Sequence, residues 1–369
     1  MLADNKTPFS AIGFEHEHRD GGLMVVIAAR GTFDLLADGK LQIAEQQALV
    51  LKDVFDGRPL STPLVRAGDL IPFKPAADVT VLANAHSPDG RPAWHWPVGV
   101  SVDKTVDHVL RVHAPRAWKW NREGLLGRWK LDYTAKGATE VPLDYRYSFG
   151  GVLNGDPNVD GKNIVAMPDQ RNPIGRGPIA RDNNVKRDID YPAAQIENPE
   201  EPLTDAQQRI EPEGFGPVPP WWTWRKRHVG TCDDDWTKMR APRAPHDFKY
   251  SYFQVAHPNL VLPSYLKGGE MIKLTGLVPG GGDLRFHVPD ITPWATFDFI
   301  DGRQVKARLH CDGLHIDLRQ GPPWRVDLTW RAWMVSCPEF WKINLFQSTF
   351  AEVAHLPFSD EAGLLEVNR

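Results

Sequence analysis

The stretch GLMVVIAARGTFDL, residues 22–35, has the alternation of an extended strand, with Val25, Ile27 and Ala29 on one side of the chain. Successive side chains of a strand point to opposite faces of a sheet, so this stretch predicts the start of a β-structure. The tripeptide DGK at residues 38–40 follows it, and its glycine can adopt the positive φ of a hairpin turn. We therefore expect the chain to reverse there and to return through the sequence LQIAEQQALVL.

Several later stretches repeat this alternation and are separated by turn signals. They are residues 77–88, 94–102, 107–115, 270–277, 283–290, 294–313, 314–320 and 325–335. Turn signals that recur roughly every eight to twelve residues are typical of sandwiches and barrels. The sequence therefore predicts a mainly β protein with antiparallel, sandwich- or barrel-like subdomains and few short helices.

The composition changes along the chain and suggests three parts. Residues 1–150 are expected to form an N-terminal antiparallel β subdomain, and residues 151–229 a long, ordered connecting region rich in proline and glycine. Residues 230–369 are expected to form a C-terminal antiparallel β subdomain that ends in a short helix capped by Ser359. Whether the two β halves are separate domains or share one core stays open.

Charge and composition argue against several classes of function. The 369 residues include 43 basic and 47 acidic side chains, so the net charge of −4 gives no overall attraction for nucleic acid or anionic lipid. The apolar run at residues 23–29 is too short to span a membrane, and no secretory signal precedes it. We expect a cytoplasmic protein that binds neither nucleic acid nor membrane.

The sequence contains no recognisable catalytic, cofactor or metal motif. The three cysteines form no C-x-x-C pair, and neither a nucleophile elbow, nor H-E-x-x-H, nor a phosphate-binding loop ending in G-K-S/T occurs. His16 and His18 could begin a metal site, but the sequence supplies no third ligand. The acidic run at residues 233–235 is better explained as the N-cap of a short helix. We assign no catalytic residue, no cofactor and no metal.

The loop sequence RNPIGRG, residues 171–177, only superficially resembles a phosphate cradle, because Pro178 follows it instead of a helix. We expect Arg171 and Arg176 to bond within the protein as clamps of a loop shaped by glycine. A second basic stretch, PPWWTWRKR, combines aromatic rings with cations. We favour aromatic rings anchored in the core beside a solvated charged edge over aromatic rings that stack on bases. A protein-binding edge is intermediate between these two interpretations. The candidate partner-binding residues are Trp221, Trp222, Trp224, Arg225 and Arg227.

Seven motifs occur in a fixed order and together resemble a known family. They are RGTFDL (30–35), DLIPFKPAADVTV (69–81), YRYSFGG (145–151), RNPIGRG (171–177), GFGPVPPWW (214–222), GTCDDDW (230–236) and FQVAHPNLVLPSYLKGGEMIKLTGL (253–277). The series is similar to the bacterial family called domain of unknown function 2169, found in type VI secretion gene clusters, over residues 7–335. The positions that match the family pattern are Phe73, Lys74, Pro75, Asp78, Phe149, Gly150, Gly151, Arg171, Asn172, Pro173, Gly175, Gly177, Gly230, Asp234 and Trp236. Cys232 departs from the pattern, since an aromatic residue is commoner there.

The resemblance implies a non-enzymatic role. Members of this family resemble cytoplasmic adaptors or chaperones that help a toxic effector, often fused to a PAAR-type tip domain, load onto the VgrG spike. The expected partner is therefore a protein: the effector, its PAAR-containing part or VgrG. Two alternatives stay open. One is a hydrolase or carbohydrate-processing enzyme on a β scaffold, which needs converging carboxylates, and the other is an immunity protein that neutralises the effector.

Overall fold

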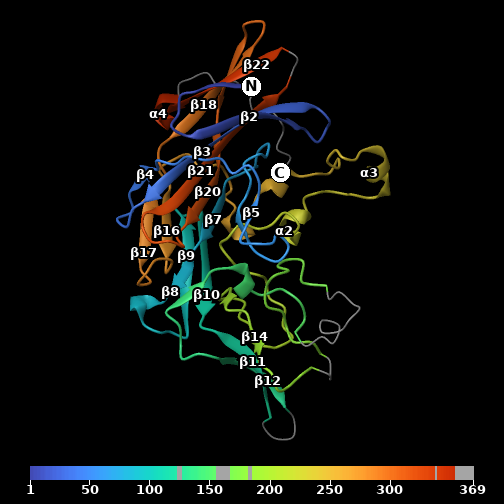
Figure 1. Ribbon diagram of the computed structural model, residues 1–369, viewed down its shortest axis with the longest axis vertical. Helices are drawn as coiled ribbons and strands as arrows, with labels where there is room; N and C mark the ends of the chain where they lie inside the picture. The colour runs from blue at the N-terminus through green and yellow to red at the C-terminus, as the bar shows by residue number, and fades with distance from the viewer. Residues whose placement is uncertain (123–126, 155–166, 182–184, 337–338, 354–369) are drawn as a thin grey trace.

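The computed structural model describes residues 1–122, 127–154, 167–181, 185–336 and 339–353. Figure 1 shows an elongated molecule whose sheets follow one another along the long axis. The helices are short: α2 (Thr223–Lys226), α3 (Asp234–Met239), α4 (Phe350–Val353), and the 3-10 turns η1 (Pro88–Gly90), η2 (Tyr145–Tyr147), η3 (Tyr250–Phe253) and η4 (Pro258–Leu260). The predicted mainly β fold is confirmed, and the sheets of the described residues are open instead of closing into a barrel.

A six-stranded sheet occupies the middle of the molecule. Its order is β2-β3-β21-β20-β7, with β4 paired to β3. The strands are β2 (Ser10–Glu17), β3 (Leu23–Leu35), β21 (Trp324–Val335), β20 (His310–Asp317), β7 (Asp78–Leu82) and β4 (Leu41–Ile43). Gly39 has a φ of 84°, so the turn predicted before β4 is present. The strand after it is shorter than expected and ends at Ile43.

The opening stretch of the sequence becomes β3, and it lies inside this sheet. Met24 to Phe33 are all buried, because β2 and β21 pair with the two edges of β3 and other elements cover both faces. The antiparallel register with β21 runs from the pair Met24–Val335 to the pair Leu35–Trp324. A strand near the N-terminus is thus joined along its length to one near the C-terminus.

A five-stranded sheet lies next to the central one. Its order is β15-β10-β9-β16-β17. The strands are β15 (Ile196–Glu197), β10 (Val106–His113), β9 (His95–Val102), β16 (Met271–Thr275) and β17 (Asp283–His287). The first of these belongs to the region expected to be a connection, the next two to the expected N-terminal subdomain and the last two to the expected C-terminal one.

A four-stranded sheet forms one end of the molecule in the order β1-β22-β18-β19. Its strands are β1 (Leu2–Asn5), β22 (Phe340–Ser348), β18 (Thr292–Phe299) and β19 (Gln304–Arg308). Strand β22 lies beyond the last stretch that the sequence analysis assigned to a strand. Its buried Ile343 and Leu345 alternate with less buried neighbours, so a period-two signal was present.

Smaller sheets complete the fold. The three-stranded sheet β12-β11-β14 lies at the end opposite β22, and two strand pairs, β13-β8 and β5-β6, join loops. These strands are β12 (Arg128–Tyr133), β11 (Arg116–Asn121), β14 (Tyr191–Pro192), β13 (Glu140–Pro142), β8 (Asn84–His86), β5 (Val54–Phe55) and β6 (Leu64–Arg66). The helix expected from Ser359 lies outside the described residues.

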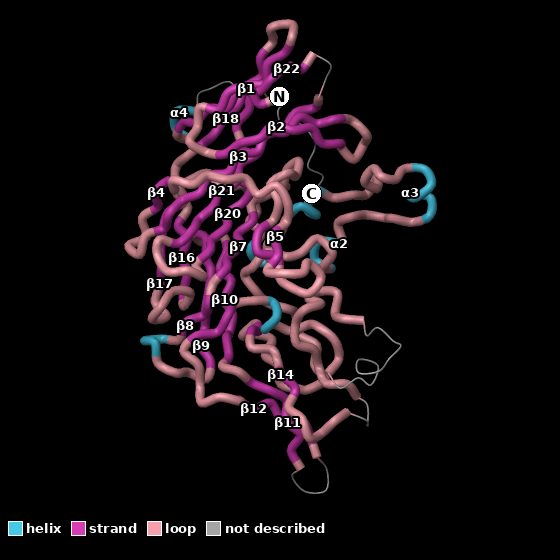
Figure 2. Tube along the Cα trace, in the orientation of Figure 1, coloured by secondary structure: helices cyan, strands magenta, loops and turns pink. Residues whose placement is uncertain are grey.

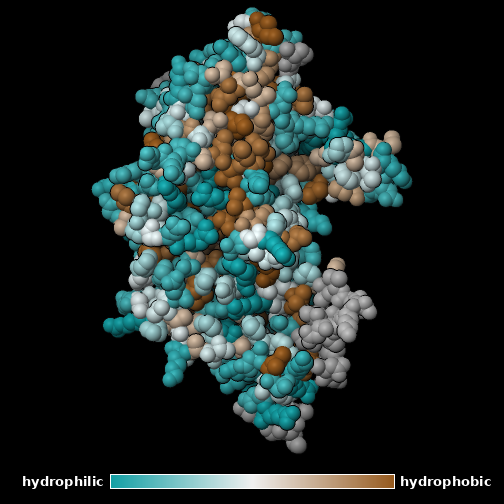
Figure 3. Space-filling view, viewed as in Figure 1, coloured by the Kyte–Doolittle hydropathy of each residue, from teal (hydrophilic) through white to brown (hydrophobic). Residues whose placement is uncertain are grey.

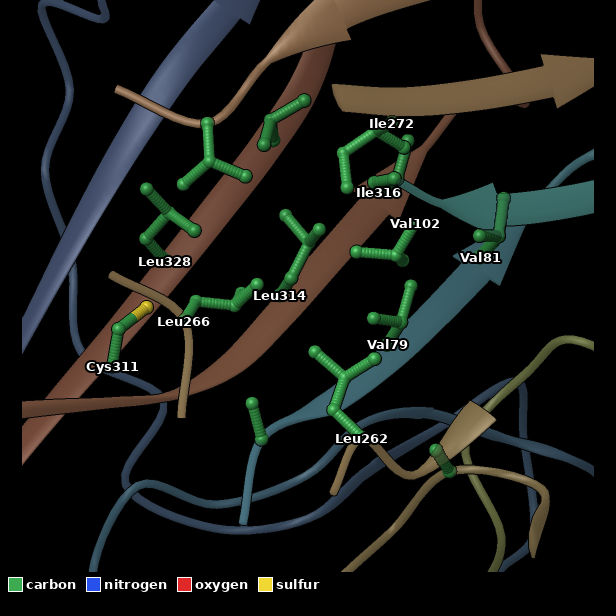
Figure 4. Packing of buried hydrophobic residues seen from close by; sticks show 14 of the residues in the cluster. Val79, Val81, Val102, Leu262, Leu266, Ile272, Cys311, Leu314, Ile316 and Leu328 are labelled. Carbon is green, nitrogen blue, oxygen red and sulfur yellow. The ribbon is translucent and has the colours of Figure 1, made fainter. Parts of the chain in front are cut away.

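The two β halves share one hydrophobic core. Val102 and Ile272 of the five-stranded sheet meet Val81 and Ile316 of the central sheet in a single buried cluster (Figure 4). The same cluster extends to Ile343 in the four-stranded sheet. The question that the sequence left open is therefore answered: strands from both expected β subdomains pair in common sheets, and residues 150 and 229 do not mark boundaries of the core.

The described part of the connecting region packs onto the body of the protein. Much of it is loop (Figure 2). It nevertheless buries Ile179, Leu203 and Ile210 in a second hydrophobic cluster together with Trp118 of β11. The apolar side chains of these loops therefore serve as anchors, as expected of an ordered connection. None of the described helices has the length and apolar character needed to cross a membrane.

Candidate interaction surface

Charged side chains from three of the central strands and one loop form a buried network. Arg30 of β3 donates to Asp69 over 3.0 Å and to Asp327 of β21 over 2.8 Å. Arg331 of β21 pairs with Asp312 of β20 and donates to the carbonyl of Asp69 over 3.0 Å. All five residues are buried. Because a buried charge is tolerated when it is paired and hydrogen-bonded, this network is a structural feature of the sheet.

The family-matched residues Phe73, Lys74 and Asp78 lie beside this network. Lys74 Nζ donates to Asp78 Oδ2 over 2.9 Å, and the same oxygen accepts the backbone N–H of Val255 over 2.6 Å. Burial raises the pKa of Asp78, and the neighbouring ammonium opposes that shift. Phe73 is buried and stacks on Trp333, and Pro75 is half-buried. These four positions are used by the fold itself.

A small cavity lies among these charges. It has a volume of about 60 Å³ and is bordered by Lys74, Asp78, Arg225, His315 and Arg331. This space suits a few water molecules and is far smaller than the usual pocket for an organic ligand. Lys74 and Arg331 at its border are already paired with the carboxylates of Asp78 and Asp312. The cavity is therefore a small space within the buried network.

The RNPIGRG loop is architectural, as predicted. Asn172 is fully buried, and its side-chain amide donates to the carbonyls of Tyr145 and Phe149, each over 2.8 Å. A Cβ placed on Gly177 would collide with the carbonyl of Val152. The remaining matched positions of this loop and its neighbour are Gly150 and Gly151, which have φ of 143° and 64°, Gly175, which is packed against Asn172, and the half-buried Pro173.

Both arginines of this loop bond within the protein, which confirms that prediction. Arg171 pairs with Asp169 over 2.6 Å and with Glu211 over 3.2 Å. These partners raise the pKa of Arg171, the Asp169 bond most of all. Arg176 donates to the carbonyl of Ala193 over 2.9 Å and to the side chain of Gln195 over 2.8 Å. Neither guanidinium is left for a ligand anion.

The stretch PPWWTWRKR is divided between the core and the surface. Trp222 is 1% exposed. Arg225 is buried and donates to the carbonyls of Tyr252 over 2.9 Å and Val218 over 3.0 Å. These two residues are therefore unavailable to a partner, contrary to their place among the partner-binding candidates. Trp221 and Trp224 are half-buried, the first stacked on Phe55 and the second edge-on to His257, and Arg227 is exposed.

The histidines first considered as metal ligands are engaged locally. His16 Nδ1 lies 2.8 Å from the carbonyl of Glu17, and His18 is stacked on Tyr250 and lies 3.2 Å from Asp20. Burial lowers the pKa of both imidazoles. In the part of the chain that the structure describes, these two histidines do not belong to a group of three metal-ligating side chains.

The third group of family-matched positions lies on a projecting arm, which we define as residues 230–247. The arm carries α3 and stands out from the body of the molecule (Figures 1 and 3). Asp233 caps α3 by accepting the N–H of Trp236 over 2.8 Å, as the sequence predicted. The indole N–H of Trp236 donates to the carbonyl of Arg243 over 2.8 Å and so ties the outgoing and returning halves of the arm together.

The base of the arm is closed and braced. Thr231 donates its backbone N–H to Asp247 over 2.9 Å and its hydroxyl to the same carboxylate over 2.8 Å. Gly230 has a φ of 87° and packs against Asp247, where a Cβ would collide. Arg243 also pairs over 2.6 Å with Glu17 at the end of β2. These contacts connect the two halves of the arm at its base and join the arm to β2, although little of the arm is buried.

The outer surface of the arm is exposed. Asp234 and Asp235 are exposed, and neither side chain has a hydrogen bond or ion pair with another described residue. Met239 is 86% exposed. A groove of about 680 Å³ runs along the arm and is lined in part by Asp235, Trp236 and Met239. A braced element that exposes carboxylates and a flexible apolar side chain has the character of a binding surface.

Comparison with known families shows which family the chain belongs to. A family model described as DUF2169, an uncharacterized protein conserved in bacteria, matches residues 20–331. The chain belongs to the DUF2169 family. The resemblance inferred from the ordered motifs is thereby confirmed at the level of the family. No curated protein and no solved structure matches the chain.

Most of the positions that were matched to the family pattern from the sequence are used by the fold, and Asp234 on the arm is an exception. The motif containing Lys74 and the one containing Asn172 lie in buried ion pairs and close loop packing. The GTCDDDW motif uses Gly230 and Trp236 to shape the arm. Its Asp234 is left exposed. The sequence placed Asp234 near the start of a helix but carried no signal that the helix would stand away from the body.

Proposed function

We propose that this protein is a non-enzymatic, cytoplasmic adaptor or chaperone of type VI secretion. In this proposal it binds a toxic effector, or the PAAR-containing part of one, and helps to load it onto the VgrG spike. The proposal combines the family resemblance in the sequence with the projecting arm in the structure. In this proposal the arm is the part of the protein that contacts the partner.

The observation that carries the proposal is the exposure of Asp234. It is one of the positions that match the family pattern, yet its side chain makes no hydrogen bond or ion pair within the described part of the chain. The neighbouring Gly230 and Trp236 are used to hold the arm in shape. A side chain that the fold does not use, on an element that the fold holds rigid, is best explained by an external partner.

The chemistry of the arm suits a protein segment. Met239 offers a flexible apolar contact, and the half-buried Trp236 borders the same groove. Asp234 and Asp235 add two negative charges that favour a basic side chain on the partner. Because the arm is already ordered by its own bonds, little conformational entropy is lost there on docking.

The proposal is tested by co-expression with a PAAR-containing type VI effector from the same bacterium. We expect the tagged protein to retain the effector through two purification steps and to raise its soluble level. The charge reversal Asp234→Arg is expected to reduce this retention at least about tenfold, the equivalent of one lost interfacial contact of about 1.4 kcal/mol. Asp107→Arg is the matched control, since Asp107 is an exposed aspartate on β10, outside the arm.

Three outcomes contradict the proposal. They are failure of the wild-type protein to retain the effector, unchanged effector secretion when the gene is deleted, and equal retention by Asp234→Arg and wild type. Protection of target cells from the toxin by this protein alone would instead favour an immunity protein.

A further inference from the structure

A buried group of three potential metal ligands lies between the five-stranded sheet and the loops that cover it. His108 belongs to β10, Glu213 to the loop just before the GFGPVPPWW motif, and His257 is the N-cap of η4. The three residues are between 2% and 4% exposed. They are far apart in the sequence, so no local spacing could have indicated them.

Two of the distances within this group are close to those between ligands of a small divalent ion. Nε2 of His108 lies 3.1 Å from Glu213 Oε2, and Nε2 of His257 lies 3.4 Å from the same oxygen. The three ligand atoms are all within 4.8 Å of one another. A tetrahedral ion with bonds of about 2.0–2.1 Å holds its ligand atoms about 3.4 Å apart.

The polar atoms of the group are incompletely satisfied by the protein. His108 Nε2 and Glu213 Oε2 are buried but do not meet the geometry of a hydrogen bond. A buried carboxylate without a compensating partner is costly, and a cation between these atoms would satisfy them together. The surroundings are otherwise aromatic: Phe215 packs edge-on against His108, and Trp224 packs edge-on against His257.

We propose that His108, Glu213 and His257 form a binding site for a divalent transition-metal ion, with Zn²⁺ as the best fit and one coordination position left to a water molecule. Imidazole nitrogen with one carboxylate oxygen is a donor set suited to Zn²⁺ and unlike the all-oxygen sets of Ca²⁺ and Mg²⁺. The ion joins a strand of the five-stranded sheet, the connecting region and the segment leading into β16. Its role is to fasten these three segments, and it is independent of the proposed adaptor function.

Asn259 affects the two histidines in opposite ways. Its side-chain amide lies 3.4 Å from Nδ1 of His108, and its oxygen can accept that N–H when the amide is turned. Such an outer contact fixes the ring with Nε2 free to bind metal. Its backbone N–H, however, donates to Nδ1 of His257 over 3.2 Å. Metal binding at Nε2 of His257 moves the ring proton to Nδ1, so this contact and the hydrogen bond of the ring with the backbone of Pro212 must both rearrange.

The test measures metal content and its effect on the full-length protein. Wild type, His257→Gln and Glu213→Gln are stripped with EDTA, incubated with Zn²⁺, passed over a desalting column and analysed by elemental mass spectrometry. We expect about one ion per chain in the wild type and about a tenth of that in either variant. His287→Gln is the control, because His287 is exposed on β17 and is expected to leave metal content unchanged.

Two further readouts keep the result interpretable if a variant folds poorly. Titrating Co²⁺ into the stripped wild type is expected to produce the visible absorption of a low-coordinate site. Adding Zn²⁺ is expected to raise the melting temperature of the wild type, because an ion that binds only the folded chain stabilises it. Sub-stoichiometric Zn²⁺ in the wild type, no Co²⁺ spectrum and an unchanged melting temperature would each overturn the proposal. The trio would then be a metal-free His–Glu–His contact.

Discussion

Lys74 and Asp78 form an ion pair inside the protein, four residues apart, with 2.9 Å between Nζ and Oδ2. Lys74 is 6% exposed and Asp78 is 1% exposed. Asp78 begins β7, while Lys74 lies in the loop before it, so the pair locks that loop onto the edge of the central sheet. The two residues matter as partners, since either charge alone would be buried without compensation.

Lys74→Met is expected to lower the free energy of unfolding by about 3–5 kcal/mol, because it leaves the Asp78 carboxylate buried and unpaired. The double variant Lys74→Met/Asp78→Asn is expected to recover part of this loss, since it removes both charges. Denaturation in urea gives both values. Lys40→Met is the control, because Lys40 pairs with Asp38 in an exposed turn. A single variant as stable as the wild type would show that the pair does not hold the loop.

The stability of the protein is expected to fall in acid through Glu197. Arg116 and His113 contact this carboxylate, and the His113 hydrogen bond and the Arg116 charge hold its pKa at about 2, against 4.5 for an ordinary glutamate. A carboxylate with a depressed pKa stabilises the folded state above its unfolded pKa, and the contribution disappears as the pH falls through the folded pKa. The window is therefore about pH 4.5 to 2, and the full contribution is about 3 kcal/mol.

Glu197→Gln tests this expectation. The difference in unfolding free energy between wild type and variant should shrink by roughly 2 kcal/mol between about pH 6 and about pH 3. Urea denaturation at the two values of pH measures it, and Glu200→Gln, an exposed neighbour, serves as the control. A difference that stays constant with pH would rule out Glu197 as the source of the acid sensitivity.

Gly177→Ala is expected to destabilise the RNPIGRG loop. The added Cβ would collide with the carbonyl of Val152, a backbone atom that cannot turn aside as a side chain can. Forcing atoms into close packing of this kind costs about 1–3 kcal/mol. A thermal melt should show the loss, while Gly282→Ala, where the new methyl group meets nothing, should melt near the wild type. Equal melting temperatures for the two variants would show that the loop adapts.

Arg225 and Arg227 are expected to differ in their contribution to stability although they lie in one short stretch. Arg225→Ala removes two buried hydrogen bonds to backbone carbonyls and should lower the unfolding free energy by about 2 kcal/mol or more. Arg227→Ala should leave stability within about 0.5 kcal/mol of the wild type, because its side chain is exposed. Urea denaturation decides between them. Stability loss in Arg227→Ala alone would contradict the structure.

Local patterns were sufficient to predict much of the secondary structure. The alternating stretches became strands, Asp233 became the cap of α3, and the DGK tripeptide became a turn at Gly39. Each of these depends on residues within a few positions of one another, and the physics involved is equally local. The glycine-rich RNPIGRG loop was also predicted to be internal, since no helix follows it to bind an anion.

What local patterns could not supply was which face of each segment would be covered. Trp222 and Trp224 are two residues apart, yet only the first is fully buried, because the loops around Tyr145 close over it. Arg225 and Arg227 are also two residues apart, and only Arg225 is buried. Burial of a loop residue depends on segments far away in the chain, and no spacing within the stretch carries that information.

The sequence by itself determined many of the strands, the short helix of the arm and the membership of the DUF2169 family. Only the tertiary structure decided that β3 pairs with β21, so that both β halves share one core, that the arm stands away from the body, and that His108, Glu213 and His257 meet. The physical reason is that strand periodicity is set by neighbouring residues. Pairing, burial and convergence are set by which distant surfaces exclude water together.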